Sequence, residues 1–262
     1  MPETILYEKT GVDNHVAVIT LNRPEASNAI NRQLRRELQE VINHFDNEDD
    51  EAWVAVITGS GRNFCAGRDL KERAADNSEG VQARAENSMS PNKPHMWERP
   101  VKPLVAAVNG AAAAGGWSIA QMCDVRLAAD NARLGITETK WSLMPPFAVE
   151  LTKMIGITNV LELVMTSELL PAERVKEMGF LNKVVPADEL VPEAIKMAES
   201  IAQNAPLAVR TIKELAYSSL DMSIAEISAK TYVAYDYILT TQDSKEGPRA
   251  FAEKRRPNWQ LK

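Results

Sequence analysis

The stretch from Pro103 to Asp124 reads PLVAAVNGAAAAGGWSIAQMCD and carries the pattern that decides the fold. Its first part, Leu104 to Val108, is a short apolar run typical of a buried strand. A loop of small residues, Asn109 to Trp117, follows directly. Because open α/β sheets bind ligands at the carboxyl ends of their strands, this loop is a candidate site.

The same pattern continues on both sides of this stretch. Leucine, valine and isoleucine recur at helical spacing over residues 31–45, which predicts an amphipathic helix. Further short apolar runs predict strands at residues 16–21, 53–58, 124–128 and 182–186. Apolar strands separated by helices or long loops predict an α/β fold with a largely parallel sheet, covered on both faces.

Helical patterns dominate after residue 147. They cover residues 159–166, 171–178, 188–204, 206–219 and 223–241. We therefore expect an α/β core over residues 1–195 and a helical C-terminal region over residues 196–262. The segment 72–100 is polar with weak periodicity and predicts a long, mobile insertion.

The composition excludes several classes of protein. With 262 residues, 45% of them hydrophobic, the chain can bury a large core and is not intrinsically disordered. Its net charge of −6 argues against a nucleic-acid partner, because phosphate backbones demand a basic surface. Two cysteines and three scattered histidines lack ligand spacing, so no metal site is expected. No membrane span and no signal peptide are expected, and a cytoplasmic location follows.

A second loop with several glycines, Gly59 to Leu70, follows the strand predicted at residues 53–58. It begins with G-x-G, but Phe64 stands where a dinucleotide-binding loop has its third glycine, so a nucleotide site is not favoured. If helices start at Asp69 and Gly116, both loops present backbone N–H groups at a helix N-terminus. Two such groups that converge form an oxyanion hole. The alternative to an oxyanion hole is that these glycines only permit tight turns and close packing.

Several blocks along the chain carry a family resemblance: LNRP at Leu21–Pro24, VITG at Val56–Gly59, FCAGRDLK at Phe64–Lys71, Pro103–Asp124 and Gly179–Val185. In this order and spacing they resemble the crotonase, or enoyl-CoA hydratase/isomerase, superfamily. The resemblance implies a ClpP/crotonase-like spiral of ββα units with a helical C-terminal trimerisation region, assembled as a homotrimer or homohexamer. It also implies an acyl-CoA thioester substrate, with coenzyme A as part of that substrate and no permanently bound cofactor.

The resemblance also implies site residues. The oxyanion hole falls on the backbone N–H groups of Arg68 and Gly115, and the acid/base falls on Glu138. Well-studied hydratases of the family have a second glutamate, whose position is taken by Ser118 in this chain. Further substrate contacts are expected at Ala26, Ala66, Leu70, Trp117 and Trp141, with core packing as the alternative for the two tryptophans.

A single matched carboxylate leaves the reaction open. The leading interpretation is an enoyl-CoA hydratase/isomerase that stabilises a thioester enolate. Ser118, the Glu138-x-x-Trp141 spacing and the pair Pro145-Pro146 resemble hydroxycinnamoyl-CoA hydratase-lyases, while single-glutamate members also include 3,2-enoyl-CoA isomerases. Further alternatives are an acyl-CoA hydrolase and a non-enzymatic RNA-binding or scaffold protein; the acidic composition and the retained Glu138 argue against the last.

Overall fold

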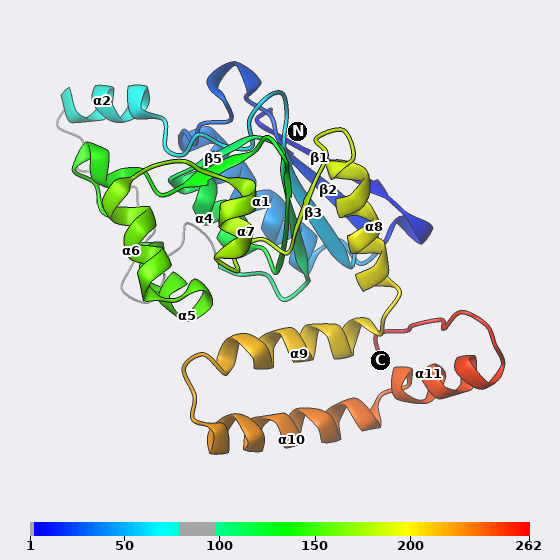
Figure 1. Ribbon diagram of the computed structural model, residues 1–262. Coiled ribbons are helices and arrows are strands. Elements are labelled where there is room, and N and C mark those ends of the chain that lie inside the picture. Colours follow the sequence, from blue (N-terminus) through cyan, green and yellow to red (C-terminus); the bar gives the residue numbers. More distant parts are fainter. Residues whose placement is uncertain (1–2, 79–97) are drawn as a thin grey trace.

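The computed structural model describes residues 3–78 and 98–262. Its main sheet has six strands in the order β1-β2-β3-β4-β6-β9 (Figure 1). β1 is antiparallel to β2, and every other neighbouring pair is parallel. The strands are Ile5–Thr10 (β1), Val16–Leu21 (β2), Val54–Gly59 (β3), Leu104–Val108 (β4), Val125–Ala129 (β6) and Lys183–Val185 (β9).

Helices cover both faces of this sheet. α1 (Arg32–Asn47) packs against β1 and β2, whereas α8 (Leu190–Ala202) packs against β2, β3, β4 and β6. Figure 1 shows the sheet between these two helices. Every residue of β3 and β4 is buried, which explains why both strands are apolar throughout rather than alternating. The α/β class predicted from the sequence is confirmed.

The start of α1 is set by its first residues. The side chain of Asn31 accepts a hydrogen bond from the backbone N–H of Leu34 at 2.8 Å, which caps the helix. Leu34, Leu38 and Phe45 are fully buried on one face. This face attaches α1 to the sheet and leaves the other face available to a pocket described below.

A second, three-stranded sheet was not predicted. Its strands are Ala111–Ala113 (β5), Arg133–Gly135 (β7) and Leu170–Pro171 (β8). β5 and β7 are parallel, with Ala113 opposite Gly135, and the N–H of Ala114 donates to the Gly135 carbonyl at 2.9 Å. Parallel strands leave a sheet at the same edge. The segments after β5 and after β7 are therefore brought side by side.

The remaining elements surround this second sheet or follow it. α4 (Gly115–Met122) starts one residue before the expected position, and α2 (Leu70–Ser78) starts one residue after it. α2 covers the beginning of the predicted insertion, and residues 79–97 of that insertion lie outside the described residues. The other short elements are η1 (Val12–Asn14), η2 (Pro24–Ala26), η3 (Glu138–Trp141), η4 (Pro146–Val149), α5 (Leu151–Ile155), α6 (Ile157–Thr166) and α7 (Ala172–Glu177).

The C-terminal helices lie apart from the sheet (Figure 1). They are α9 (Pro206–Ser218), α10 (Ile224–Thr240) and α11 (Asp243–Ala252). α10 buries none of its residues, and Ile224, Tyr232 and Val233 are 85%, 72% and 72% exposed. The predicted boundary between residues 195 and 196 lies inside α8. Within the described ranges, no helix is long and apolar enough to cross a membrane.

Candidate active site

Backbone hydrogen bonds join the two glycine-containing loops. The N–H of Cys65 donates to the Ala111 carbonyl at 3.0 Å, and the N–H of Ala113 donates to the Cys65 carbonyl at 3.0 Å. On the other side of the loop, the N–H of Ile30 donates to the Gly67 carbonyl at 2.8 Å. The loop after β3 is therefore held against β5, directly before the start of α4.

Glycine is required where the loops meet. Gly67 has a φ of +89°, and a Cβ atom on it would lie 2.7 Å from the Ala113 carbonyl oxygen and 3.2 Å from the Gly115 nitrogen. Such a contact is too close for any side chain, and the positive φ is one that glycine adopts without strain. The residue that follows Gly67 is thereby brought next to the first turn of α4.

The two amides expected to form the oxyanion hole are both available to a ligand. Arg68 and Gly115 line the same pocket. Among the residues that the structure describes, neither backbone N–H donates a hydrogen bond to the protein. Ala114, between the second sheet and α4, has a φ of 54° and a ψ of −117°, a conformation that glycine prefers. Strain of this kind clusters at functional sites.

Glu138 is the first residue of η3 and follows β7 closely. A hydrogen bond attaches this segment to α6, because the Thr139 hydroxyl donates to the Val164 carbonyl at 2.7 Å. Oε2 of Glu138 is buried and has no hydrogen-bond partner within the described residues. Burial raises the pKa of Glu138 to about 7, although backbone N–H groups of Glu138 and Thr137 act in the opposite direction.

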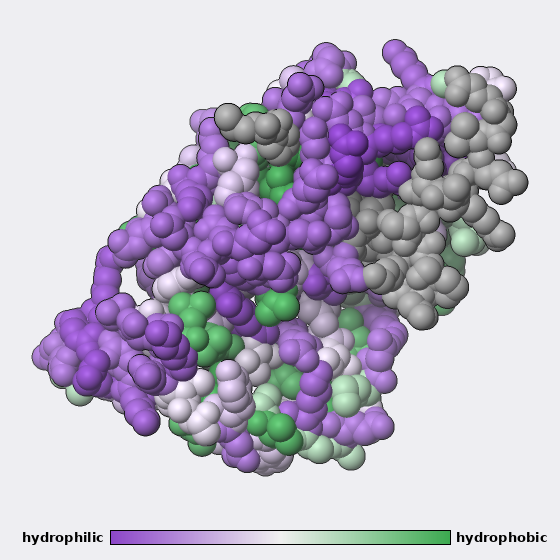
Figure 2. Space-filling view, turned by 180° about the vertical axis from the view of Figure 1, so that it is seen from behind, coloured by the Kyte–Doolittle hydropathy of each residue, from purple (hydrophilic) through white to green (hydrophobic). Residues whose placement is uncertain are grey.

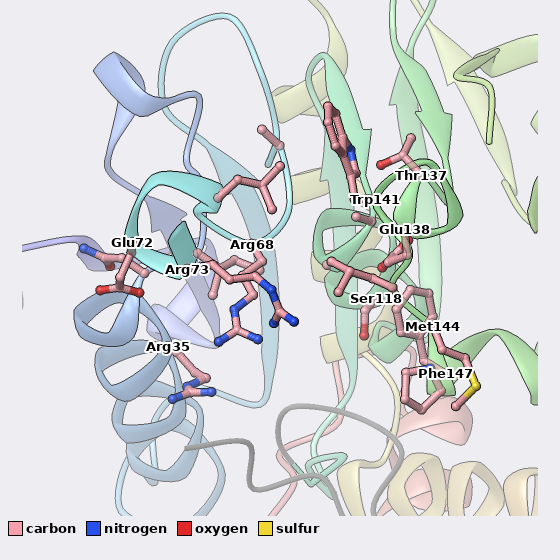
Figure 3. A pocket seen from close by; sticks show the side chains of 18 of the residues that line it. Arg35, Arg68, Glu72, Arg73, Ser118, Thr137, Glu138, Trp141, Met144 and Phe147 are labelled. Atoms are coloured by element: carbon pink, nitrogen blue, oxygen red, sulfur yellow. The ribbon is translucent and has the colours of Figure 1, made fainter. Parts of the chain in front are cut away.

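These groups face a pocket of about 340 Å³ (Figure 3). Its two sides differ in chemistry. Ser118, Glu138, Trp141, Met144 and Phe147 lie on one side, and Arg35, Arg68 and Arg73 lie on the other. A carboxyl group, two backbone N–H groups and an apolar wall thus share one cavity, which is the inventory needed to bind a carbonyl and to move a proton beside it.

The structure brings most of the predicted site residues together. Those that line the pocket are Ala66, Arg68, Leu70, Gly115, Ser118, Glu138 and Trp141. Trp141 is 62% exposed at its rim. Ala26 lies in η2, outside the set of lining residues.

Trp117 is a correction to the sequence prediction. Its side chain is fully buried and does not line the pocket. It stacks on Phe180 with 4.1 Å between ring centroids and 20° between the planes. Because the side chain of Trp117 leaves α4 on the core side, packing was the correct interpretation of this residue.

Sequence reasoning missed three arginines of the pocket, Arg32, Arg35 and Arg73. Arg35 and Arg73 belong to α1 and α2, where single arginines are typical of solvent-exposed faces. No spacing in the sequence signals that both helices face one cavity. For metals, the described residues contain no group of three or more His, Cys, Asp or Glu that could hold an ion.

Comparisons with known proteins show the family of this chain. A family model described as Enoyl-CoA hydratase/isomerase matches residues 11–262. Enoyl-CoA hydratase EchA19 of Mycobacterium tuberculosis is 38% identical over 261 residues, covering 97% of this chain and 96% of that protein. A crystal structure of enoyl-CoA hydratase from Bacillus anthracis has a TM-score of 0.91 and 36% identity, covering 99% and 100% of the two chains. Another, from Mycobacterium tuberculosis H37Rv, has a TM-score of 0.88 and 35% identity, with 100% coverage of both chains.

The chain belongs to the enoyl-CoA hydratase/isomerase family and has the crotonase fold. The family resemblance found in the sequence is therefore confirmed, and so is the expectation that the protein is an enzyme of enoyl-CoA hydratase/isomerase type.

Proposed function

We propose that this enzyme adds water across the double bond of an enoyl-CoA thioester in the pocket around Glu138. The observation that carries the proposal is the buried, unpartnered Oε2 of Glu138 in the pocket that Arg68 and Gly115 also line. A buried acceptor without a partner costs free energy unless a ligand or water meets it. An enoyl-CoA with its attacking water supplies that partner.

The two loop amides stabilise the charge that builds during the reaction. When the thioester carbonyl oxygen accepts from the N–H groups of Arg68 and Gly115, electron density is drawn from the double bond. Attack of water on the β-carbon then leaves an enolate, whose negative charge lies on this same oxygen. Removing one such donor typically costs about 3–4 kcal/mol of transition-state stabilisation.

Glu138 carries out both proton transfers. As a carboxylate it takes a proton from the attacking water while the C–O bond forms, and as the resulting carboxylic acid it gives that proton to the α-carbon of the enolate. The sum is one water added to the double bond, and Glu138 returns to its starting state. A pKa of about 7 suits both steps, because a group that serves as acid and base works best near the operating pH.

Isomerisation is the second candidate, and Ser118 favours it. Ser118 is almost fully buried beside the pocket, and it stands where a second carboxylate is expected in two-glutamate hydratases. Moving a double bond needs only one base, which takes a proton from one carbon and returns it to another. Cleavage of the hydrated product to an aldehyde, as in the hydratase-lyases, would follow from the same first step.

Product analysis separates these reactions. The enzyme is incubated with short, branched and aromatic enoyl-CoA thioesters, and the products are read by mass spectrometry. A product heavier by one water supports hydration, an unchanged mass with a moved double bond supports isomerisation, and a released aldehyde supports lyase action. Conversion that is unaffected in Glu138→Gln would contradict the role of the carboxylate.

Coenzyme A is proposed to enter with the substrate, with no cofactor held permanently. Ala66 and Leu70 lie at the pocket and are the expected contacts for its pantetheine arm, with Ala26 further along. We also propose that the chain assembles as a homotrimer or homohexamer. Apolar side chains gather over α9 and α10 (Figure 2), and an assembly would cover them. Light scattering of the purified protein tests the assembly, and a monomer would contradict it.

A further inference from the structure

The side of the pocket opposite Glu138 carries several arginines. Arg35 comes from α1, Arg68 from the loop after β3, and Arg73 from α2. Figure 3 shows these three side chains together on one side of the cavity, facing Ser118 and Glu138 on the other. We call Arg35, Arg68 and Arg73 the arginine wall. In a chain with a net charge of −6, such a cluster is a local exception.

The acidic residues beside this wall form their hydrogen bonds and ion pairs with other residues. Asp69 pairs with Arg23 at 3.3 Å. The carboxylate of Glu72 accepts from the backbone N–H of Arg32 at 3.1 Å, and Asp76 pairs with the guanidinium of Arg32. Within the described part of the chain, the guanidinium groups of Arg68 and Arg73 make no ion pair and no hydrogen bond.

The positive charges are also partly removed from water. Arg68 and Arg73 are half-buried. Burial, followed by the charges of Arg73 and Arg35, lowers the pKa of Arg68, while the charges of Asp76 and Glu72 act in the opposite direction. On balance the surroundings destabilise this cation. Like charges that are drawn together at a partly buried site are unfavourable, and an anionic ligand reverses the effect.

The arginine wall is separate from the proton-transferring group. Burial and two backbone N–H groups account for the shifted pKa of Glu138, and no arginine contributes. A guanidinium beside that carboxylate would lower its pKa strongly. An anion at the arginine wall therefore lies across the cavity from Glu138 and leaves the reacting atoms free.

We propose that Arg68 and Arg73 bind a carboxylate carried by the acyl group, so that the substrates are CoA thioesters of unsaturated dicarboxylic acids. This inference rests on the proposed function, because it assumes that the thioester carbonyl lies at the amides of Arg68 and Gly115. The phosphates of coenzyme A offer similar chemistry. Free coenzyme A, which carries the phosphates but no acyl group, separates these two sources of negative charge in the test.

The test is equilibrium binding, which does not depend on turnover. Glutaryl-, adipoyl- and suberoyl-CoA are compared with pentanoyl-, hexanoyl- and octanoyl-CoA by isothermal titration calorimetry, with free coenzyme A as a third arm. For the best chain length, the dicarboxylic thioester should bind roughly ten- to a hundredfold more tightly than its monocarboxylic partner, as a charge-assisted hydrogen bond predicts. Arg68→Met and Arg73→Met should each remove most of this preference, and Arg73→Lys should restore part of it.

A matched control is Arg36→Met on α1. Arg36 is exposed, pairs with Glu40 at 3.8 Å and does not line the pocket, so the preference should stay as in the wild type. Circular dichroism melting curves identify any variant that fails to fold, in which case Arg73→Gln replaces it.

Two results would overturn the proposal. One is a wild-type protein that shows no preference for any dicarboxylic thioester. The other is an equal loss of affinity for both thioesters and for free coenzyme A in the variants, which would assign the arginines to a phosphate. Failure of the proposed function would give a different result. The protein would then prefer dicarboxylic thioesters in binding but would convert no enoyl-CoA.

Discussion

Gly116 lies against Cys65 so closely that a Cβ atom on the glycine would stand 2.1 Å from the Cys65 carbonyl oxygen. This contact joins the first turn of α4 to the loop that carries Arg68, and both proposed oxyanion-hole amides depend on it. We predict that Gly116→Ala forces the two loops apart. Stability should fall by about 1–3 kcal/mol in urea unfolding, and activity should fall at least tenfold.

Gly247→Ala is the control for this prediction. Gly247 lies inside α11. A Cβ atom added to it would lie 3.4 Å from the nearest atom, in the Trp259 ring, which is an ordinary contact. This variant should keep wild-type activity. A Gly116→Ala enzyme as active as Gly247→Ala would contradict the role given to the loop contact.

Replacing the buried carboxyl should remove catalysis but not binding. In Glu138→Gln the amides of Arg68 and Gly115 are retained, while the acid/base is lost. We expect kcat to fall by a factor on the order of 10²–10⁴, with the affinity for coenzyme A thioesters near that of the wild type. Glu173→Gln, an exposed carboxylate in the first turn of α7, should change neither quantity.

The raised pKa of Glu138 predicts a pH dependence of stability with a definite sign. Burial raises this pKa from 4.5 to about 7, so the folded state holds its proton more tightly than the unfolded state. The stability of the wild type relative to Glu138→Gln should therefore decrease as pH rises from 4.5 to 7, by about 1–3 kcal/mol. Urea unfolding of both proteins across this range measures the difference, and a constant difference would contradict the burial of the carboxyl.

The same pKa predicts the pH dependence of activity. Hydration starts from the carboxylate, so kcat/KM should rise with pH and level off above an inflection near 7. Initial rates with a converted enoyl-CoA measure the profile. An inflection near 4.5, the ordinary value for glutamate, would mean that another group sets the rate.

Ser118 should matter less than Glu138. Its hydroxyl lies at the pocket without a hydrogen-bond partner among the described residues, and no histidine of the pocket could activate it as a nucleophile. We expect Ser118→Ala to lower kcat by no more than about tenfold, the effect of losing a single weak hydrogen bond to water or substrate. A loss equal to that of Glu138→Gln would show that the serine positions an essential group.

Ala114 has a backbone conformation that glycine adopts with less strain than alanine. At a φ of 54° and a ψ of −117°, an L-residue is strained by roughly 1–3 kcal/mol. This exceeds the entropic cost of a glycine, so Ala114→Gly should raise the melting temperature. Ala113→Gly, one residue earlier in β5, should lower it, because glycine weakens a strand. Equal effects at the two positions would contradict the strain.

Local sequence patterns predicted much of the architecture. The apolar runs at β2 and β4, and the helical spacing of α1 and α10, coincide closely with the observed elements. Such runs are informative because burial of a strand or of one helix face requires apolar residues at fixed spacing. The second sheet left no comparable signal, since β5 is a run of three alanines and β8 has only two residues.

The sequence by itself determined the class of fold, the two loops and the family, because these depend on residues close together along the chain and on motifs in a fixed order. Only the tertiary structure decided which side chains meet. It placed Trp117 in the core and Trp141 at the pocket. It also left Oε2 of Glu138 buried without a hydrogen-bond partner among the described residues, and it brought arginines from α1 and α2 to one side of the pocket. The physical reason is that burial, pKa and the convergence of charges depend on packing between segments far apart in sequence.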